Sequence, residues 1–160
     1  MSSATIRVIC ICSGNICRTP MAVALLREIF AREQRSAVVI SAGTLGLQGR
    51  RASEFARQAM SEKGEDWARH TDEHRSQAIS PPILHLADYI IVMAPNHSEF
   101  LRAKAPEVSS KVVPLWQYSD PSSLLREIAD PVGKDLEAFR ECRDLLESCL
   151  HRWVETLPSF

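Results

Sequence analysis

A chain of 160 residues, of which 45% are hydrophobic and 24% are charged, has the length and composition of one globular domain, so we expect residues 1–160 to fold as one unit rather than as a disordered or repetitive chain. Lysines and arginines number 19 against 20 aspartates and glutamates, and the net charge of −1 excludes a global basic field for nucleic acid or an anionic membrane. Any recognition of an anion must therefore be local.

The first predicted element is a strand over Ile6–Cys12, because its nearly unbroken apolar and β-branched residues are typical of a strand covered on both faces. This run is too short for a membrane span and lacks a basic leader, so we expect neither a transmembrane helix nor a signal peptide. After a short loop, an apolar stripe at helical spacing predicts a helix with Thr19 as its N-cap and Pro20 in its first turn. The stripe consists of Met21, Leu25, Leu26, Ile29 and Phe30.

Strands and helices alternate along the rest of the chain. A helix is predicted over Ser53–Lys63, and another at Asn96, which has Glu99 three residues later as a capping partner. Apolar residues at helical spacing over 136–157 predict one long amphipathic helix. The remaining predicted strands are Val38–Ala42, Tyr89–Ala94 and Val112–Trp116. The alternation predicts an α/β fold with a parallel sheet, and its ligand site is expected beyond the carboxyl ends of the strands, at the loop after the first strand.

That loop has the pattern C-x5-R, from Cys12 to Arg18. Backbone N–H groups of a tight loop at a helix N-terminus form a preformed anion site suited to phosphate, and the same field stabilises a nucleophilic thiolate. The planar fork of Arg18 can hold two phosphoryl oxygens, and Thr19 can donate its hydroxyl to the sulfur when Cys12 is the leaving group. The predicted phosphate-binding residues are Ser13, Gly14, Asn15, Ile16, Cys17, Arg18 and Thr19.

The same pattern has a purely structural interpretation, in which Cys12 ends a core strand and Arg18 caps a helix by chance. C-x5-R alone is a loose pattern. Its place between a strand and a helix, with Gly14 and Asn15 inside the loop and Thr19 directly after it, favours phosphate chemistry.

The segment VICICSGNICRTPMA, residues 8–22, resembles the signature of the low-molecular-weight protein-tyrosine phosphatase family. The resemblance continues in VVISAGT (38–44), DYIIVMA (88–94) and EIADPVG (127–133). It implies a three-layer sandwich with a four-stranded parallel sheet and helices on both faces. It also implies hydrolysis of phosphotyrosine through a phosphocysteine intermediate, in which Cys12 attacks phosphorus, Arg18 binds the phosphoryl group and Asp130 protonates the leaving group.

Two Asp-Pro dipeptides compete for the role of acid, at Asp120 and at Asp130, and either could simply be a turn. Asp130 is preferred because its surroundings follow the family pattern and lead directly into the last helix. We expect Asp130 to protonate the leaving group and then, as a carboxylate, to activate the water that hydrolyses the phosphocysteine.

The family also couples the loop asparagine, here Asn15, to a serine and a histidine. These would be Ser41 and His74, with nearby His70 as an alternative for the histidine and a surface role as an alternative for His74. Within the family, the cysteine at the position of Cys17 can form a reversible disulfide with the nucleophile, whereas Cys17 could also simply pack under the helix. Cys10, Cys142 and Cys149 are expected to be core residues.

Departures from the family pattern bear on the substrate. Ser13 stands where phosphotyrosine enzymes usually carry an aliphatic residue, Val132 replaces a common aromatic residue, and Leu47 and Gln48 lie near the usual aromatic wall. Related bacterial protein arginine phosphatases carry threonine at the position of Ser13. Phosphotyrosine is still the main prediction, because the aromatic residues Trp116 and Tyr118 could supply a rim for a phenyl ring. Phosphoarginine is the alternative.

Two other functions are disfavoured. A thioredoxin-coupled arsenate reductase on this fold needs further redox cysteines near the third strand, and residues 88–97 contain none. A noncatalytic phosphate-binding module would need neither Cys12 nor Asp130.

The same sequence predicts the setting of the enzyme. No histidine and cysteine spacing indicates a metal site, so neither metal nor cofactor is expected. The odd number of cysteines, 5, fits a reducing cytoplasm. The expected partner is a phosphorylated protein or peptide, not nucleic acid or a membrane, and a monomer is favoured.

Overall fold

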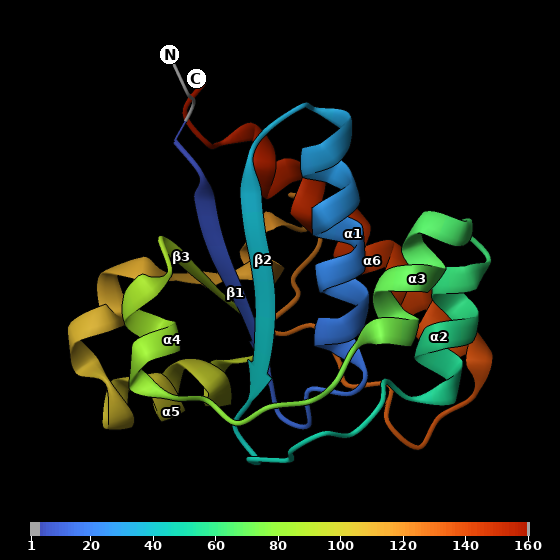
Figure 1. The fold of residues 1–160 in the computed structure, drawn as a ribbon, viewed down its shortest axis with the longest axis horizontal. Helices are drawn as coiled ribbons and strands as arrows, with labels where there is room; N and C mark the ends of the chain where they lie inside the picture. The colour runs from blue at the N-terminus through green and yellow to red at the C-terminus, as the bar shows by residue number, and fades with distance from the viewer. Residues whose placement is uncertain (1–3, 160) are drawn as a thin grey trace.

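The computed structural model describes residues 4–159. Its four parallel strands form one sheet in the order β2-β1-β3-β4 (Figure 1). β1 lies between β2 and β3, so the strand order reverses beside it. The strands span Ile6–Cys12 (β1), Ala37–Gly43 (β2), Tyr89–Val92 (β3) and Val112–Pro114 (β4). The predicted α/β class with a four-stranded parallel sheet is therefore confirmed.

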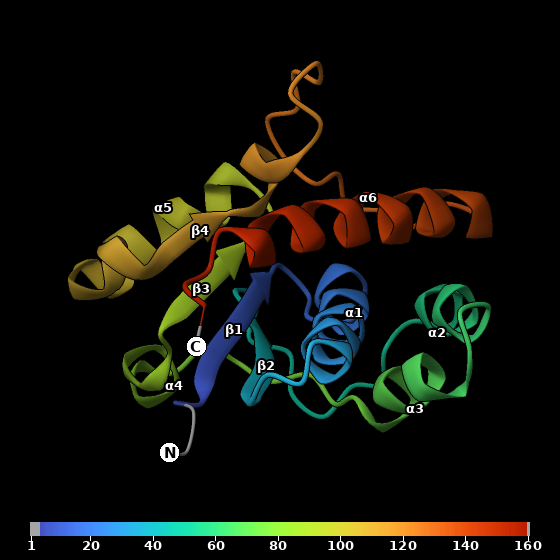
Figure 2. The same cartoon turned by 90° about the horizontal axis from the view of Figure 1, so that it is seen from above.

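Helices cover both faces of the sheet, so the three-layer prediction is also confirmed. Figure 2 shows α1 and α6 on one side with α2 and α3 beyond them, and α4 and α5 on the other side. The α-helices span Arg18–Arg32 (α1), Glu54–Ser61 (α2), Glu65–Glu73 (α3), Pro81–Leu86 (α4), Pro95–Lys104 (α5) and Leu136–Glu155 (α6). Short 3-10 helices follow α5 and β4, at Pro106–Lys111 (η1) and Leu115–Tyr118 (η2).

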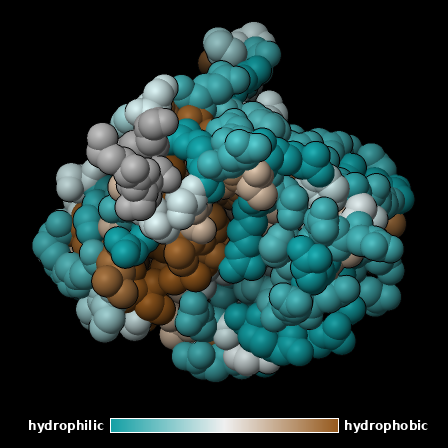
Figure 3. Space-filling model, turned by 45° about the horizontal axis from the view of Figure 1, so that its top comes forward, coloured by the Kyte–Doolittle hydropathy of each residue, from teal (hydrophilic) through white to brown (hydrophobic). Residues whose placement is uncertain are grey.

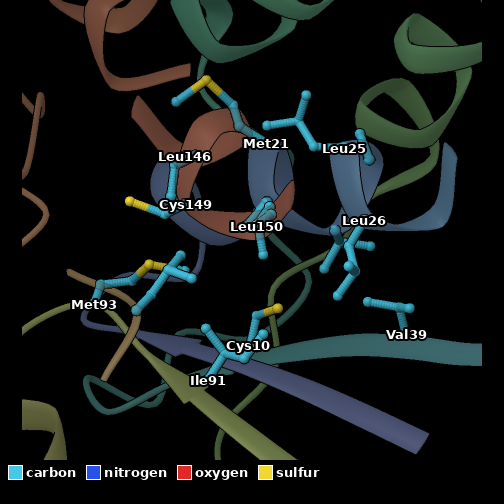
Figure 4. Packing of buried hydrophobic residues seen from close by; sticks show 14 of the residues in the cluster. Cys10, Met21, Leu25, Leu26, Val39, Ile91, Met93, Leu146, Cys149 and Leu150 are labelled. Atoms are coloured by element: carbon cyan, nitrogen blue, oxygen red, sulfur yellow. The ribbon is translucent and has the colours of Figure 1, made fainter. Parts of the chain in front are cut away.

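Alternate residues of β1 point into two separate cores, as the two-residue period of a strand requires. Val8, Cys10 and Cys12 pack with α1 and α6, whereas Ile9 and Ile11 pack with α4 and α5. Figure 4 shows the first of these cores, where side chains of α1 and α6 meet above β1 and β3. Cys12 therefore ends β1 on the face from which α1 departs.

The three cysteines predicted as core residues are buried. Cys10 lies in β1, and Cys142 and Cys149 lie on the inner face of α6. Burial raises the pKa of Cys10 and of Cys142 to about 12, and that of Cys149 to about 11. These thiols stay protonated at neutral pH and act as small apolar side chains.

Two helix starts differ from the predictions. The N-cap of α1 is Cys17 and not Thr19, because Thr19 lies inside the first turn and its hydroxyl is used in the loop. α5 begins at Pro95, with Ala94 as its N-cap, so Asn96 and Glu99 do not form the expected cap.

The sequence did not predict α3 or α4. α3 is almost entirely polar and buries only Thr71, so it lacks an apolar stripe. Trp67 helps to hold α3 against α1, because the guanidinium of Arg32 lies over the Trp67 ring, 4.7 Å from its centroid. α4 has only 6 residues, too few for a helical period to be recognised.

An apolar groove of about 170 Å³ lies between α4 and the β1–β2 side of the sheet. Figure 3 shows an apolar area on this side of the molecule, left of centre. Val38 and Leu86 are exposed apolar residues that border the groove, and the exposed Arg7 also lines it. Within residues 4–159, no helix is both long and apolar enough to cross a membrane.

Candidate active site

The sulfur of Cys12 lies at the bottom of the loop between β1 and α1. The residue is only 2% exposed, and its Sγ accepts the backbone N–H of Asn15 at 3.3 Å. The hydroxyl of Thr19 lies 3.2 Å from the same sulfur. The loop therefore surrounds Cys12 with donors, as an anionic sulfur requires.

The hydrogen bonds of Asn15 show which way the hydroxyl of Thr19 points. The side-chain Oδ1 of Asn15 accepts the backbone N–H of Gln77 at 2.9 Å, so its Nδ2 is the donor. Nδ2 donates to Thr19 Oγ1 at 2.7 Å. Because Thr19 accepts this bond, its own hydrogen is free to be donated to Cys12 Sγ.

Asn15 is in the left-handed region, with φ +58°, and its neighbours hold it there. Its Nδ2 also donates to Ser41 Oγ at 2.8 Å, and its carbonyl oxygen lies 2.6 Å from His74 Nε2. The structure thus brings together Asn15, Ser41 and His74, the sequence-predicted support set. His70 lies elsewhere, between Arg27 and Glu28.

Two features of this support were not resolved by the sequence. The backbone N–H of Gln77 is a third anchor of Asn15, and a backbone group leaves no signature in a sequence. Burial lowers the pKa of His74, so the ring is held largely neutral and donates from Nε2 to the carbonyl of Asn15.

Arg18, the first residue of α1, is only 4% exposed, and its guanidinium is held from one side. Its Nη1 donates to the carbonyl oxygen of Ile128 at 2.8 Å, and its Nη2 lies 3.5 Å from Asp130 Oδ2. Its buried Nε has no hydrogen-bond partner among residues 4–159. A buried donor without a partner is costly, and a bound phosphoryl oxygen would satisfy it.

The structure places Asp130, and not Asp120, beside Arg18. The carboxylate of Asp130 accepts the backbone N–H of Val132 through Oδ1 at 3.1 Å, which leaves Oδ2 directed at Arg18. Asp120 instead lies on the exposed segment after η2, where its Oδ2 is 3.6 Å from Arg152. Of the two Asp-Pro aspartates, only Asp130 therefore lies at the cysteine loop.

Ser13 has a partner that the sequence did not predict. Its Oγ lies 3.0 Å from Nε2 of His97, a fully buried residue in the first turn of α5. α5 thereby contacts the cysteine loop.

Cys17 is buried at the N-terminus of α1, where its thiol donates to Ser53 Oγ at 3.6 Å. Burial raises its pKa to about 11. The packing role of Cys17 is thus visible, while its pairing with Cys12 under oxidation stays a prediction.

Two residues that lie near the cysteine loop and Asp130, Leu47 and Val132, are aliphatic. Leu47 lies against the loop, with its Cδ1 3.9 Å from where a Cβ on Gly14 would be. Val132, beside Asp130, is 57% exposed. Trp116 and Tyr118 are partly buried and pack against the cores.

Gly43, the last residue of β2, is required by the close approach of the cysteine loop. A Cβ there would lie 2.7 Å from the carbonyl oxygen of Ser13 and 2.9 Å from Cβ of Asn15. We expect Gly43→Ala to displace the loop and to lower kcat/KM for para-nitrophenyl phosphate about tenfold or more, since small misplacements cost large factors in rate. Gly46→Ala is the matched control, because Gly46 has φ +72° but open space around it. That control should lose some stability and keep its kcat/KM; equal kcat/KM in both variants would contradict this role of Gly43.

Comparisons with known proteins agree with this geometry. A family model described as "Low molecular weight phosphotyrosine protein phosphatase" matches residues 7–159. A protein-arginine-phosphatase of Geobacillus stearothermophilus is 33% identical over 153 residues, covering 96% of this chain and 97% of its own. A probable low molecular weight protein-tyrosine-phosphatase, EpsP, of Ralstonia nicotianae is 35% identical over 150 residues, covering 94% and 93%. The solved structure of a mutant YwlE arginine phosphatase with a phosphorylated active-site serine matches with a TM-score of 0.84 and 28% identity, over 95% of each chain.

Proposed function

The chain belongs to the low molecular weight phosphotyrosine protein phosphatase family. From this membership and the geometry of the site, we propose that it hydrolyses phosphotyrosine in proteins through a phosphocysteine intermediate, without a metal ion. One observation carries the proposal. Cys12 Sγ lies among loop donors, while the buried Nε of Arg18 beside the loop has no hydrogen-bond partner in the described part of the chain, residues 4–159. An anion with several oxygens fits both features.

In the first step, Cys12 Sγ attacks phosphorus, so that a sulfur–phosphorus bond forms as the phosphorus–oxygen bond to tyrosine breaks. Asp130 gives its proton to the departing phenolic oxygen, which leaves as tyrosine. Arg18 is positioned by the carbonyl of Ile128 to neutralise charge on the transferring phosphoryl oxygens.

In the second step, the carboxylate of Asp130 takes a proton from water as the water oxygen bonds to phosphorus. The sulfur–phosphorus bond breaks, inorganic phosphate forms, and the electron pair returns to Cys12 Sγ. The hydroxyl of Thr19 and the N–H of Asn15 stabilise the released thiolate. The phosphorylated active-site serine reported for the YwlE mutant supports a covalent phosphoenzyme for this site.

Asp130→Asn is expected to lower kcat/KM for phosphotyrosine about 10²- to 10⁴-fold, the usual contribution of a general acid. The loss should be smaller for para-nitrophenyl phosphate, whose leaving group needs less protonation. Steady-state rates on both substrates measure this difference. Asp120→Asn, at the other Asp-Pro dipeptide, should stay near wild type, and an equal loss in both variants would refute the assignment of Asp130 as the acid.

Phosphoarginine is a second candidate substrate, favoured by two features of the site. The polar hydroxyl of Ser13 follows the nucleophile, while the exposed neighbour of Asp130 is Val132 rather than an aromatic residue. Rates on two peptides of the same sequence, one with phosphotyrosine and one with phosphoarginine, decide the order. We expect phosphotyrosine to be preferred; parity or a preference for phosphoarginine would reverse it.

The setting that we propose is a reducing cytoplasm, with a phosphorylated protein as the substrate. All five cysteines are free in the structure, which supports this setting.

Peroxide treatment followed by mass spectrometry tests the proposed disulfide between Cys12 and Cys17. A product that lacks two hydrogens and links Cys12 to Cys17 would support the disulfide, whereas oxidation at Cys12 alone would leave Cys17 as a packing residue.

A further inference from the structure

His97 touches the cysteine loop from α5, a helix that supplies none of the residues assigned above. It occupies the third position of the helix, and its exposed fraction is 0%. Its Nδ1 accepts the backbone N–H of Ala94 at 3.1 Å, and its Nε2 lies 3.0 Å from Ser13 Oγ. His97 therefore joins the first turn of α5 to the residue that follows the nucleophile.

These two contacts fix the direction of each hydrogen bond. Burial, aided by the positive charge of Arg18, lowers the pKa of His97 to about 4, so the ring is neutral at pH 7. A neutral imidazole carries one N–H, and Nδ1 is already an acceptor. Nε2 must then carry the hydrogen and donate it to Ser13 Oγ.

The hydroxyl oxygen of Ser13 therefore accepts a hydrogen bond from His97. A hydroxyl has one hydrogen and two lone pairs, and the N–H of His97 occupies one lone pair. Among residues 4–159, no other hydrogen bond uses the hydrogen or the second lone pair of Ser13 Oγ, and the residue is only partly buried. Ser13 can thus donate to a bound phosphoryl oxygen and accept from a polar leaving group.

We propose that His97 is a positioning residue for substrate discrimination, holding the Ser13 hydroxyl so that it favours a guanidinium leaving group relative to a phenyl one. The inference rests on the proposed phosphatase function and deepens it. A guanidinium supplies the N–H that the second lone pair of Ser13 can accept, whereas a phenyl ring covers the hydroxyl without pairing with it. The pair thus sets how far this enzyme accepts phosphoarginine beside phosphotyrosine.

A purely structural role for His97, as the cap of α5, can be separated from this one. In His97→Asn, the side-chain oxygen can take the place of Nδ1 and accept the N–H of Ala94. The shorter side chain cannot reach Ser13, so this variant keeps the cap and removes the contact with the loop. Its melting temperature shows whether the cap is kept.

The experiment compares the wild type, Ser13→Ala, His97→Asn and the double variant. For each protein, kcat/KM is measured on matched phosphotyrosine and phosphoarginine peptides, and the ratio of arginine to tyrosine is formed. We expect each single variant to lower this ratio about fivefold, as for the loss of one hydrogen bond. The double variant should lower it no further than Ser13→Ala alone, because His97 acts through Ser13.

Other outcomes would overturn the inference. An unchanged ratio in His97→Asn, or an effect of equal size when Ser13 is already alanine, would leave His97 as a structural residue only. A wild type that hydrolyses phosphotyrosine and not phosphoarginine would also contradict it, while leaving the proposed function intact. A wild type that hydrolyses neither peptide nor para-nitrophenyl phosphate would contradict the proposed function, and the inference with it.

Discussion

Cys12→Ser is expected to lower kcat for para-nitrophenyl phosphate by a factor on the order of 10⁴ or more, comparable with removal of the nucleophile in other covalent enzymes. A serine hydroxyl is a far weaker nucleophile than a thiolate at neutral pH. The donors around the sulfur, the N–H of Asn15 and the hydroxyl of Thr19, remain in place. The variant should therefore still bind inorganic phosphate while its turnover is lost, which initial rates and calorimetric titration would show.

The matched control is Cys149→Ser. Cys149 is fully buried on α6 and belongs to the core rather than to the loop. A hydroxyl buried there should lower the melting temperature, since it lacks the favourable burial of the thiol, but kcat should stay near that of the wild type. Full activity in Cys12→Ser would refute the nucleophilic role.

Arg18→Lys is expected to lower kcat about a hundredfold or more, which is a loss of several kcal/mol in transition-state stabilisation. The structure explains why a retained charge is not enough. Nη1 of Arg18 is bound to the carbonyl of Ile128, and this bond sets the plane in which Nε and Nη2 are presented. A lysine has a single ammonium group and cannot reproduce two fixed donors.

Arg51→Lys serves as the control, because Arg51 is exposed in the loop after β2. It should keep kcat and KM within about twofold, as surface substitutions usually do. Inhibition by vanadate, a mimic of the transferring phosphoryl group, gives a second readout, and Arg18→Lys should weaken it more than it weakens substrate binding. Near-normal kcat in Arg18→Lys would contradict the need for a planar fork.

The cysteine loop could be predicted from the sequence because all its parts are local. β1 spans the predicted residues Ile6–Cys12, and the N-cap of the next helix is Cys17, two residues before the predicted Thr19. A strand, a tight loop and a helix then leave little freedom for where Cys12 and Arg18 lie. The position of Asp130 beside Arg18 followed instead from the family resemblance, since 112 residues separate the two in sequence.

The support of Asn15 could be predicted only in part. His70 and His74 are separated by one helical turn, and α3 decides which of them reaches the loop, yet α3 itself has no apolar stripe. α3 ends at Glu73, and His74 follows in extended backbone, directed at Asn15. Polar helices that depend on tertiary contacts leave a weak periodic signal.

Pro95 is the sequence signal that indicates the position of His97. A proline favours the first position of a helix, so Pro95 indicates an N-cap at Ala94 and a third position at His97. Asn96 and Glu99 suggested a later start, because both residue types suit a cap. What no sequence pattern could show is that the ring of His97 also reaches Ser13, 84 residues earlier in the chain.

Transfer of the phosphoryl group to Cys12 is the central step of the proposed mechanism, and trapping the phosphocysteine intermediate tests it most directly. The wild-type enzyme is mixed with a phosphotyrosine peptide, denatured within milliseconds, digested and analysed by mass spectrometry. We predict one phosphoryl group on the peptide that contains Cys12, present during turnover and absent once the substrate is consumed. Continued turnover with no phosphoryl group on Cys12 at any time would show direct attack by water and contradict the account.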